Sequence, residues 1–452
     1  MKIIIVGAGV IGINLARTLS EENHEVYLIE RDEATARKVD EKLDVKVVVG
    51  NGADPDTLKE AGAESADMVI AVTLSDETNL VVCSLASAFG TKQMIARVRN
   101  ASLNLALGVF GYDKFHINET INPEEVAAYS ILKAVETPGA REVADFSSGR
   151  ILLRAFDIPL NSPLCGQKIG ELREEAFPWP FLIVAIIRNS EVLIPKGNTI
   201  IEPSERIYVL LPSTSVSEFL TFVDPAIRKP KKVIIYGASK IGEKVAQEIS
   251  AYIKDVVLLE EDIQWAEEVA GRLEAVRVIN GAGSEADILK EAGIEAADAF
   301  IAVSENDHSN LVSAVLAKKM GAKTTIITTQ QPDYATIVRA LDIDVIINPR
   351  FLAVDQILRL VRGKGISAIT KFMERDAEAL ELVAEKDSPI TQGPIKKINI
   401  PKNAIIGAIC RDSEVFLANG ESCIQEGETV IVFCQENAAK KIQALFTAKK
   451  IF

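Results

Sequence analysis

The chain has 452 residues and is 48% hydrophobic, which is enough for two to four compact units with separate cores. Its formal net charge of −14 argues against nucleic acid as the main partner, because phosphate binding needs an excess of Lys and Arg. The five cysteines form no CxxC pair, which indicates neither a disulfide framework nor a zinc site, and no apolar run approaches the roughly 20 residues of a membrane-spanning helix.

The first 136 residues alternate short apolar runs with helix-length amphipathic stretches. Fully apolar strands between helices are typical of a doubly wound parallel sheet with both faces covered. Helix-start signals agree with this pattern, because Asp54-Pro55, Asp76 and Asn122-Pro123 are good capping sequences. The expected strands are Ile3–Val6, Val26–Ile29, Val45–Val49, Met68–Val72 and Met94–Val98.

The pattern changes after Thr137-Pro138-Gly139, which should end the last of these helices. The expected strands then lie at 151–158, 182–187 and 207–211, separated by Pro and Gly turns, as in a small α+β module. The segment 224–232 contains two prolines and four basic residues and is typical of a linker.

The rest of the chain repeats this scheme. Residues 7–12 match 237–242 at an offset of 230, and residues 56–62 match 287–293 at an offset of 231. A break near 363–365 separates the second sheet from a second small module. We therefore predict an α/β chain of two Rossmann-like domains, 1–136 and 225–364, each followed by a small α+β module, 137–224 and 365–452.

A glycine loop carries the strongest functional signal. Gly7, Gly9 and Gly12 follow an apolar strand and open a helix, and Glu30 ends the next strand 18 residues after Gly12. In such a loop the first glycine forms the turn, the second admits a pyrophosphate and the third lets helix and strand pack closely. The free N–H groups of the helix start would bind the phosphates.

Glu30 is placed to accept hydrogen bonds from ribose hydroxyls and would repel a 2′-phosphate, so NAD or ATP/ADP fits better than NADP. Arg31 weakens that distinction. Ligands of open α/β sheets lie beyond the carboxyl ends of the strands, which adds Thr73, Leu74 and Arg97, the last as a phosphate clamp. The first predicted site comprises Gly7, Ala8, Gly9, Val10, Ile11, Gly12, Glu30, Arg31, Asn51, Thr73, Leu74 and Arg97.

The second copy departs from this pattern. Ser239 replaces the middle glycine, Glu261 replaces Arg31 and Thr328 replaces Arg97, so phosphates should be held less well, although Lys240 in the loop compensates in part. A second nucleotide site and a purely structural copy both remain open. The predicted second site comprises Gly237, Ala238, Ser239, Lys240, Ile241, Glu260 and Ser304.

Catalytic machinery is not apparent in the sequence. The three histidines, His24, His116 and His308, show no arrangement with a nucleophile or a metal, and neither a nucleophile elbow nor a P-loop lysine motif is present. This pattern favours nucleotide binding over turnover. The alternative is a Rossmann-type NAD-dependent oxidoreductase whose small modules serve as substrate domains.

Four segments, residues 2–12, 50–54, 71–79 and 96–99, resemble the RCK or KTN nucleotide-binding domain. The repeated order of nucleotide-binding domain and small module resembles the TrkA family of regulatory subunits of Trk potassium uptake systems. The resemblance implies a non-enzymatic, cytoplasmic protein, peripheral at the inner face of the cell membrane. It also implies a homo-oligomeric gating ring on a TrkH-like potassium-conducting subunit, which NAD(H) or ATP/ADP would bias between conformations.

Overall fold

The computed structural model describes residues 1–172, 179–189, 191–224, 228–331, 334, 341–362, 366–371, 377–412 and 414–448. The chain forms two compact units, Met1–Ala127 with Asn348–Leu358, and Ala128–Ile347 with Arg359–Phe452. Two of the three boundaries, after Ala127 and after Leu358, fall inside helices, so the four-domain division expected from the sequence stays a prediction. Within the described residues, no helix is both long and apolar enough to cross a bilayer.

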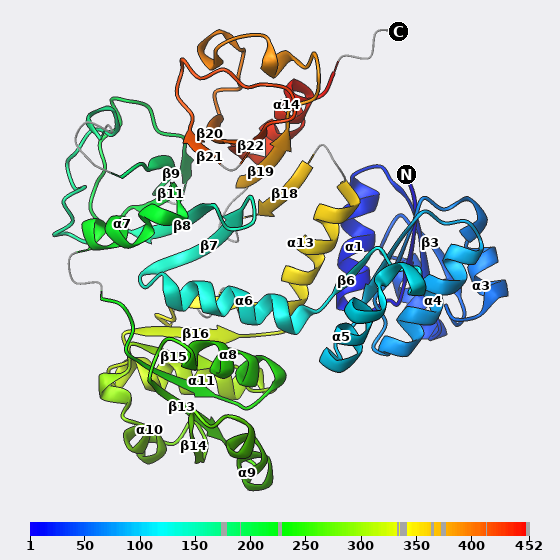
Figure 1. Cartoon of the computed structure of the whole chain (residues 1–452), viewed down its shortest axis with the longest axis horizontal. Coiled ribbons are helices and arrows are strands. Elements are labelled where there is room, and N and C mark those ends of the chain that lie inside the picture. Colours follow the sequence, from blue (N-terminus) through cyan, green and yellow to red (C-terminus); the bar gives the residue numbers. More distant parts are fainter. Residues whose placement is uncertain are drawn as a thin grey trace. The chain divides into compact units, whose positions relative to one another are not determined.

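The first unit contains a six-stranded parallel sheet with the order β3-β2-β1-β4-β5-β6. The strand order changes direction beside β1, which makes the carboxyl edge between β1 and β4 the switch point where such folds bind ligands. The blue and cyan ribbons of Figure 1 show helices beside this sheet. The strands are β1 (Lys2–Val6), β2 (Glu25–Glu30), β3 (Lys46–Val49), β4 (Met68–Ala71), β5 (Gln93–Arg97) and β6 (Glu119–Ile121).

Helix caps in this unit follow the sequence only in part: Asp54 stands at the N-cap of its helix, but its side chain accepts no N–H of that helix. Asn122 caps the last helix, because its side-chain oxygen accepts the N–H of Glu124 at 3.1 Å. The predicted cap at Asp76 is wrong: Ser75 caps α4, and Asp76 instead accepts the backbone N–H of Arg99 at 2.8 Å. The helices are α1 (Val10–Glu21), α2 (Glu33–Asp40), α3 (Pro55–Glu60), α4 (Asp76–Ala88), α5 (Ala101–Phe110) and α6 (Pro123–Glu136).

The second unit contains a parallel sheet of the same topology, β14-β13-β12-β15-β16-β17. The predicted duplication is therefore confirmed at the level of the fold. The predicted break at 363–365 lies outside the described residues. Its elements are β12 (Lys232–Tyr236), α8 (Lys240–Ser250), β13 (Asp255–Glu260), α9 (Ile263–Arg272), β14 (Arg277–Asn280), α10 (Ala286–Ala292), β15 (Ala299–Ala302), α11 (Asp307–Lys319), β16 (Thr324–Thr328) and β17 (Val345–Ile347). Helix α13 (Pro349–Arg362) follows, and its residues up to Leu358 belong to the first unit.

Each small module is built on a five-stranded antiparallel sheet, ordered β10-β9-β11-β8-β7 in the first and β18-β19-β22-β20-β21 in the second. The first comprises β7 (Ala140–Phe146), β8 (Ile151–Asp157), β9 (Leu182–Arg188), β10 (Glu191–Leu193), β11 (Arg206–Pro212) and α7 (Val216–Val223). The second comprises β18 (Ile366–Lys371), β19 (Ala377–Val383), β20 (Ala404–Arg411), β21 (Glu414–Leu417), β22 (Thr429–Gln435) and α14 (Glu436–Phe446).

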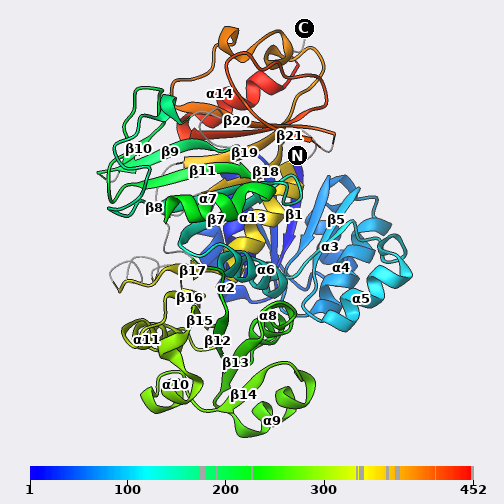
Figure 2. The same cartoon turned by 60° about the vertical axis from the view of Figure 1, so that its left-hand side comes forward.

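The two small modules share one hydrophobic core. Buried side chains from both sheets form a single cluster, in which the rings of Tyr208 and Phe433 lie 5.7 Å apart. A buried polar contact joins them as well, because the hydroxyl of Ser147 donates to Glu381 at 2.8 Å. Figure 2 shows the two sheets side by side. Their pairing inside one chain is a face-to-face sheet packing.

A buried ion pair stabilises the first small module. Arg154 is 1% exposed, and its guanidinium lies 2.8 Å from the carboxylate of Asp145. Asp145→Ala would leave the cation buried without its partner, so we expect the free energy of unfolding to fall by about 3–5 kcal/mol. Lys396→Ala, which removes an exposed 2.6 Å pair with Glu421, should cost less than about 1 kcal/mol. Urea unfolding of the full chain compares the two, and equal losses would contradict this assignment.

Candidate nucleotide-binding site

The glycine loop follows β1 and is shaped by two tight approaches. Gly7 has φ +105°, a conformation that favours glycine, and a Cβ there would lie 3.2 Å from the backbone of Thr73. A Cβ on Gly12 would lie 1.9 Å from the carbonyl oxygen of Gly7. A Cβ on Gly9 would meet nothing within 4 Å. Gly7 and Gly12 are therefore needed by the backbone, whereas Gly9 leaves open space above the loop.

Helix α1 begins directly after this open space. Gly9 is its N-cap and provides no side-chain acceptor, and its first turn contains no acidic residue. The first N–H groups of a helix have no partner within the helix, and the helix dipole makes this end positive. The start of α1 is thus a place for an anion, as the sequence predicts.

Glu30 holds the loop in place. One carboxylate oxygen accepts the N–H of Ala8 at 2.8 Å, and the other accepts the N–H of Asp32 at 2.9 Å. The sequence indicated a ribose contact for Glu30 but not this structural one. Because an ionised carboxylate accepts about four hydrogen bonds, two remain for a ligand. The ribose contact stays a prediction.

Asn79, the last residue of the segment 71–79, ties two strand ends together. Its side chain is fully buried, and its oxygen accepts the N–H of Thr73 at 2.9 Å while its amide donates to the carbonyl of Arg97 at 2.9 Å. Asn310 repeats this arrangement in the second half by accepting the N–H of Ser304 at 2.9 Å. The recurrence of Asn at positions 79 and 310, an offset of 231, is the sequence signal that could have indicated this role.

Arg97 ends β5 at the same carboxyl edge of the sheet. Its Nε is buried without a hydrogen-bond partner, and an Nη1 donates to the carbonyl of Thr73 at 3.4 Å. Burial and the neighbouring Arg99 lower the pKa of Arg97, whereas Glu124 and Asp76 oppose that shift. Glu124 is itself paired with Arg99 at 2.7 Å. A cation with an unmet donor at this edge fits a phosphate oxygen.

The other predicted residues of the first site differ in their exposure and in the groups that could face a ligand. Ile11 is buried, so only its backbone can face a ligand, and Leu74 is 82% exposed in the loop after β4. Arg31 is exposed after β2. Asn51 follows β3, and its side-chain oxygen accepts the N–H of Ala53 at 3.1 Å. Their contacts with a nucleotide stay predictions.

The second loop has the same backbone frame. Gly237 has φ +98°, a Cβ on Gly242 would lie 2.0 Å from the carbonyl oxygen of Gly237, and Glu260 accepts the N–H of Ala238 at 2.7 Å. Lys240 is exposed at the start of α8. The two loops therefore have the same backbone conformation and the same carboxylate contact, and they differ in their side chains.

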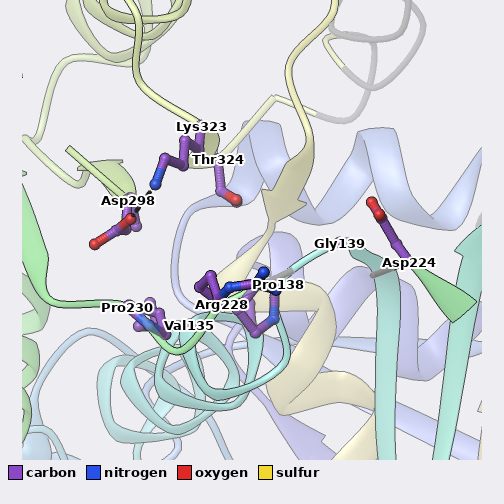
Figure 3. Close-up of a pocket in the computed structure, with 11 residues that line it drawn as sticks. Val135, Pro138, Gly139, Asp224, Arg228, Pro230, Asp298, Lys323 and Thr324 are labelled. Atoms are coloured by element: carbon purple, nitrogen blue, oxygen red, sulfur yellow. Dashed lines mark hydrogen bonds and ion pairs between the residues drawn. The ribbon is translucent and has the colours of Figure 1, made fainter. Parts of the chain in front are cut away.

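A separate cavity of about 380 Å³ lies at the opposite, amino edge of the second sheet. Figure 3 shows Lys323 next to Asp298 at its wall, where Lys323 Nζ lies 2.7 Å from the carboxylate of Asp298. The cavity is therefore distinct from the glycine loops, which lie at the carboxyl edges. Its lining residues are Ala134, Val135, Pro138, Gly139, Asp224, Arg228, Pro230, Asp298, Ala299, Lys323 and Thr324.

Comparison with known proteins agrees with this geometry. The TrkA-N domain family matches residues 3–122 and 233–349, and the TrkA-C domain family matches residues 153–224. Trk system potassium uptake protein TrkA of Halomonas elongata is 31% identical over 451 residues, which cover 99% of this chain and 98% of that protein. The chain belongs to the TrkA family. A second member, from Vibrio alginolyticus, is 32% identical with both chains covered in full.

Solved structures show the same fold at lower sequence identity than these TrkA family members. The GsuK RCK domain is 17% identical with a TM-score of 0.62, covering 98% of this chain and 94% of that one. The GsuK channel bound to NAD is 16% identical with a TM-score of 0.62, covering 98% of this chain and 78% of that one. The predicted tandem Rossmann-like fold with small modules is thereby confirmed.

The middle and the last glycine of the loop should respond differently to the same substitution. Gly12→Ala places a methyl group against the Gly7 carbonyl, so we expect the free energy of unfolding to fall by about 1–3 kcal/mol. Gly9→Ala meets open space and should leave the stability within about 0.5 kcal/mol. Chemical denaturation of both variants without nucleotide measures this difference. A stable Gly12→Ala protein would show that helix and strand do not need this close approach.

Proposed function

We propose that this TrkA family chain is a cytosolic regulatory subunit that binds NAD(H) or ATP/ADP in its first half and gates a potassium-conducting membrane subunit of the TrkH type. A homo-oligomeric ring would carry the conformational change to that subunit. The observation that carries the proposal is Arg97, whose buried Nε lacks a partner at the same sheet edge as the uncapped start of α1. Both features attract phosphate.

The ligand chemistry follows from the positions of these groups. A pyrophosphate would lie over Gly9, where the backbone leaves room, and would accept hydrogen bonds from the first N–H groups of α1. The two free acceptor positions of Glu30 suit ribose hydroxyls and disfavour a 2′-phosphate. The solved GsuK channel bound to NAD and the GsuK structure bound to ADP support these two ligand classes.

Gating requires a difference in affinity between two conformations. A nucleotide that bridges α1, Glu30 and Arg97 would join three elements whose spacing can differ between two states of the domain. A 100-fold preference for one state supplies about 2.7 kcal/mol per site, and several sites in a ring act together. The curated family members are named Trk system potassium uptake proteins, which supports potassium as the transported ion.

An oxidoreductase remains the rival function, because its cofactor site would be similar. His308 illustrates why binding is favoured: its ring nitrogen lies 2.8 Å from the hydroxyl of Tyr334, and both residues belong to the second half, whereas the proposed nucleotide site belongs to the first. Nothing in this pair resembles a hydride-transfer site with a positioned acid at the nicotinamide.

Replacing Arg97 tests the nucleotide site directly. Loss of a charge-assisted hydrogen bond is worth about 1.5–3 kcal/mol, so Arg97→Ala should weaken NADH or ATP binding roughly 10-fold to 100-fold. Arg37→Ala, which removes an exposed arginine paired with Glu33, should leave binding unchanged. Calorimetric titration of both proteins measures the affinities. Equal affinities for wild type and Arg97→Ala would remove the main support for the site.

Potassium flux tests the regulatory part of the proposal. Vesicles containing the potassium-conducting subunit and the wild-type chain should show nucleotide-dependent flux, and Arg97→Ala should shift its midpoint to higher nucleotide concentration. An anaerobic assay with NADH and a panel of small carbonyl substrates should show binding without net oxidation. Steady NADH turnover would favour the oxidoreductase, whereas binding with flux indifferent to nucleotide would contradict the regulatory function.

A further inference from the structure

The two glycine loops share their backbone but not the side chains around it. Four positions of the first half, Val6, Gly9, Arg31 and Thr35, correspond to larger or oppositely charged residues of the second. Their counterparts are Tyr236, Ser239, Glu261 and Trp265. Each counterpart makes a contact that has no equivalent in the first half, and together these contacts determine whether the second loop is open to a nucleotide.

Ser239 occupies the start of its own helix. Ser239 is the N-cap of α8: its hydroxyl oxygen accepts the N–H of Gly242 at 3.2 Å, and its O–H donates to the carbonyl of Val303 at 2.6 Å. At Gly9 the same direction from the backbone is open space. The serine hydroxyl thus takes an N–H group that a phosphate would need, and it is held there by a second hydrogen bond.

Tyr236 is the last residue of β12, the strand beside the switch point of the second sheet. Its side chain is 1% exposed and lies close to Gly283, where a Cβ would be 2.6 Å from the ring, as Val6 lies close to Gly52 in the first half. Its hydroxyl donates to the carboxylate of Glu261 at the end of β13. Burial and Glu261 raise the pKa of Tyr236 to about 12, so the phenol stays protonated and remains a donor near neutral pH. Val6 has no such ring.

The charge of the second loop opposes phosphate. The first site sets Glu30 and Asp32 against two arginines, Arg31 and Arg97, so its charges cancel. The corresponding positions of the second site are three successive carboxylates, Glu260, Glu261 and Asp262, with Thr328 in place of Arg97. Lys240, which corresponds to Val10, is the one cation among these positions. Three carboxylates and one lysine leave a local charge of −2. Anionic ligands are repelled from such a cluster.

Trp265 closes the outer side of the second loop. Its indole N–H donates to the carbonyl of Ala238 at 2.8 Å, and the guanidinium of Arg272 lies 4.7 Å from the ring centre. Arg272 is held by Glu243, 2.8 Å away on α8. The corresponding Thr35 only bonds to its own helix cap, Asp32, at 2.6 Å. The tryptophan therefore fixes α9 against the loop.

We infer that the second half is closed by its own side chains and takes no nucleotide, so that each chain binds one nucleotide, in its first half. The count of one rests on the proposed function of the first site, whereas the closure rests only on contacts within the second half. Ser239 takes the place of a phosphate, Tyr236 places a ring beside the switch point and Glu261 reverses the charge. The second half then serves as a domain of fixed conformation.

Reversing these substitutions gives a direct test. In calorimetric titrations of the full chain with NADH and with ATP, the wild type should bind one nucleotide per chain. The variant Tyr236→Val, Ser239→Gly, Glu261→Arg, Trp265→Thr, Thr328→Arg should bind two, and adding Arg97→Ala to it should weaken only one of them. A wild-type stoichiometry of two would overturn the inference, as would a folded variant that still binds one.

Two measurements on otherwise intact protein keep the test decisive if that variant does not fold. Hydrogen exchange of the wild type with ATP should slow in residues 6–20 and stay unchanged in residues 236–250. In Trp179→Phe, Trp265 is the single tryptophan, and its emission should not change on ATP addition. Slower hydrogen exchange in residues 236–250, or a saturable change of the Trp265 emission, would contradict the inference that the second half is closed. No binding in the wild type would refute the first site instead.

Discussion

The crossing of α1 over the turn after β1 is the constraint on which the rest of each Rossmann-like domain depends. The backbone at Gly12 approaches the Gly7 carbonyl so closely that a Cβ would lie 1.9 Å from it. This approach places the positive end of the helix at the carboxyl edge of the sheet, beside the switch in strand order. Glu30 then fixes the loop by accepting the N–H of Ala8. The close approach of Gly12 to Gly7 therefore determines both the path of the loop and the position of the positive helix end.

The duplicated domain retains this constraint while its binding chemistry has changed. Gly242 and Glu260 reproduce the close approach and the carboxylate contact, because the fold requires both. The middle loop position has no such requirement, and there glycine has given way to Ser239, which satisfies the helix start internally. The residues that the backbone conformation requires are therefore different from the residue that leaves room for a ligand. The positions with a backbone role, Gly12 and Glu30, are identical in the two copies, whereas Gly9, whose Cβ position is open space, is not.

The sequence predicted the parallel sheets well, because their strands are continuous apolar runs bounded by helix signals. It did not predict β6, whose three residues from Glu119 to Ile121 are too few and too polar for a periodic signal. Ser75 and Asp76 are both good capping residues, and only the distant N–H of Arg99, which Asp76 accepts, distinguishes them. The contacts of Asn79 and Tyr236 likewise join residues from separate strands, which no local pattern reveals.

The shared core of the two small modules has a consequence for assembly. Because Tyr208 and Phe433 belong to one chain, the modules meet at a fixed effective concentration rather than at the concentration of the protein in solution. Dilution that would separate two independent subunits leaves this pairing intact. Covalent linkage also allows the two faces to differ: Ser147 contributes its hydroxyl from one sheet and Glu381 its carboxylate from the other. A single chain can therefore maintain an asymmetric pair that identical subunits joined by a twofold axis would have to make symmetric.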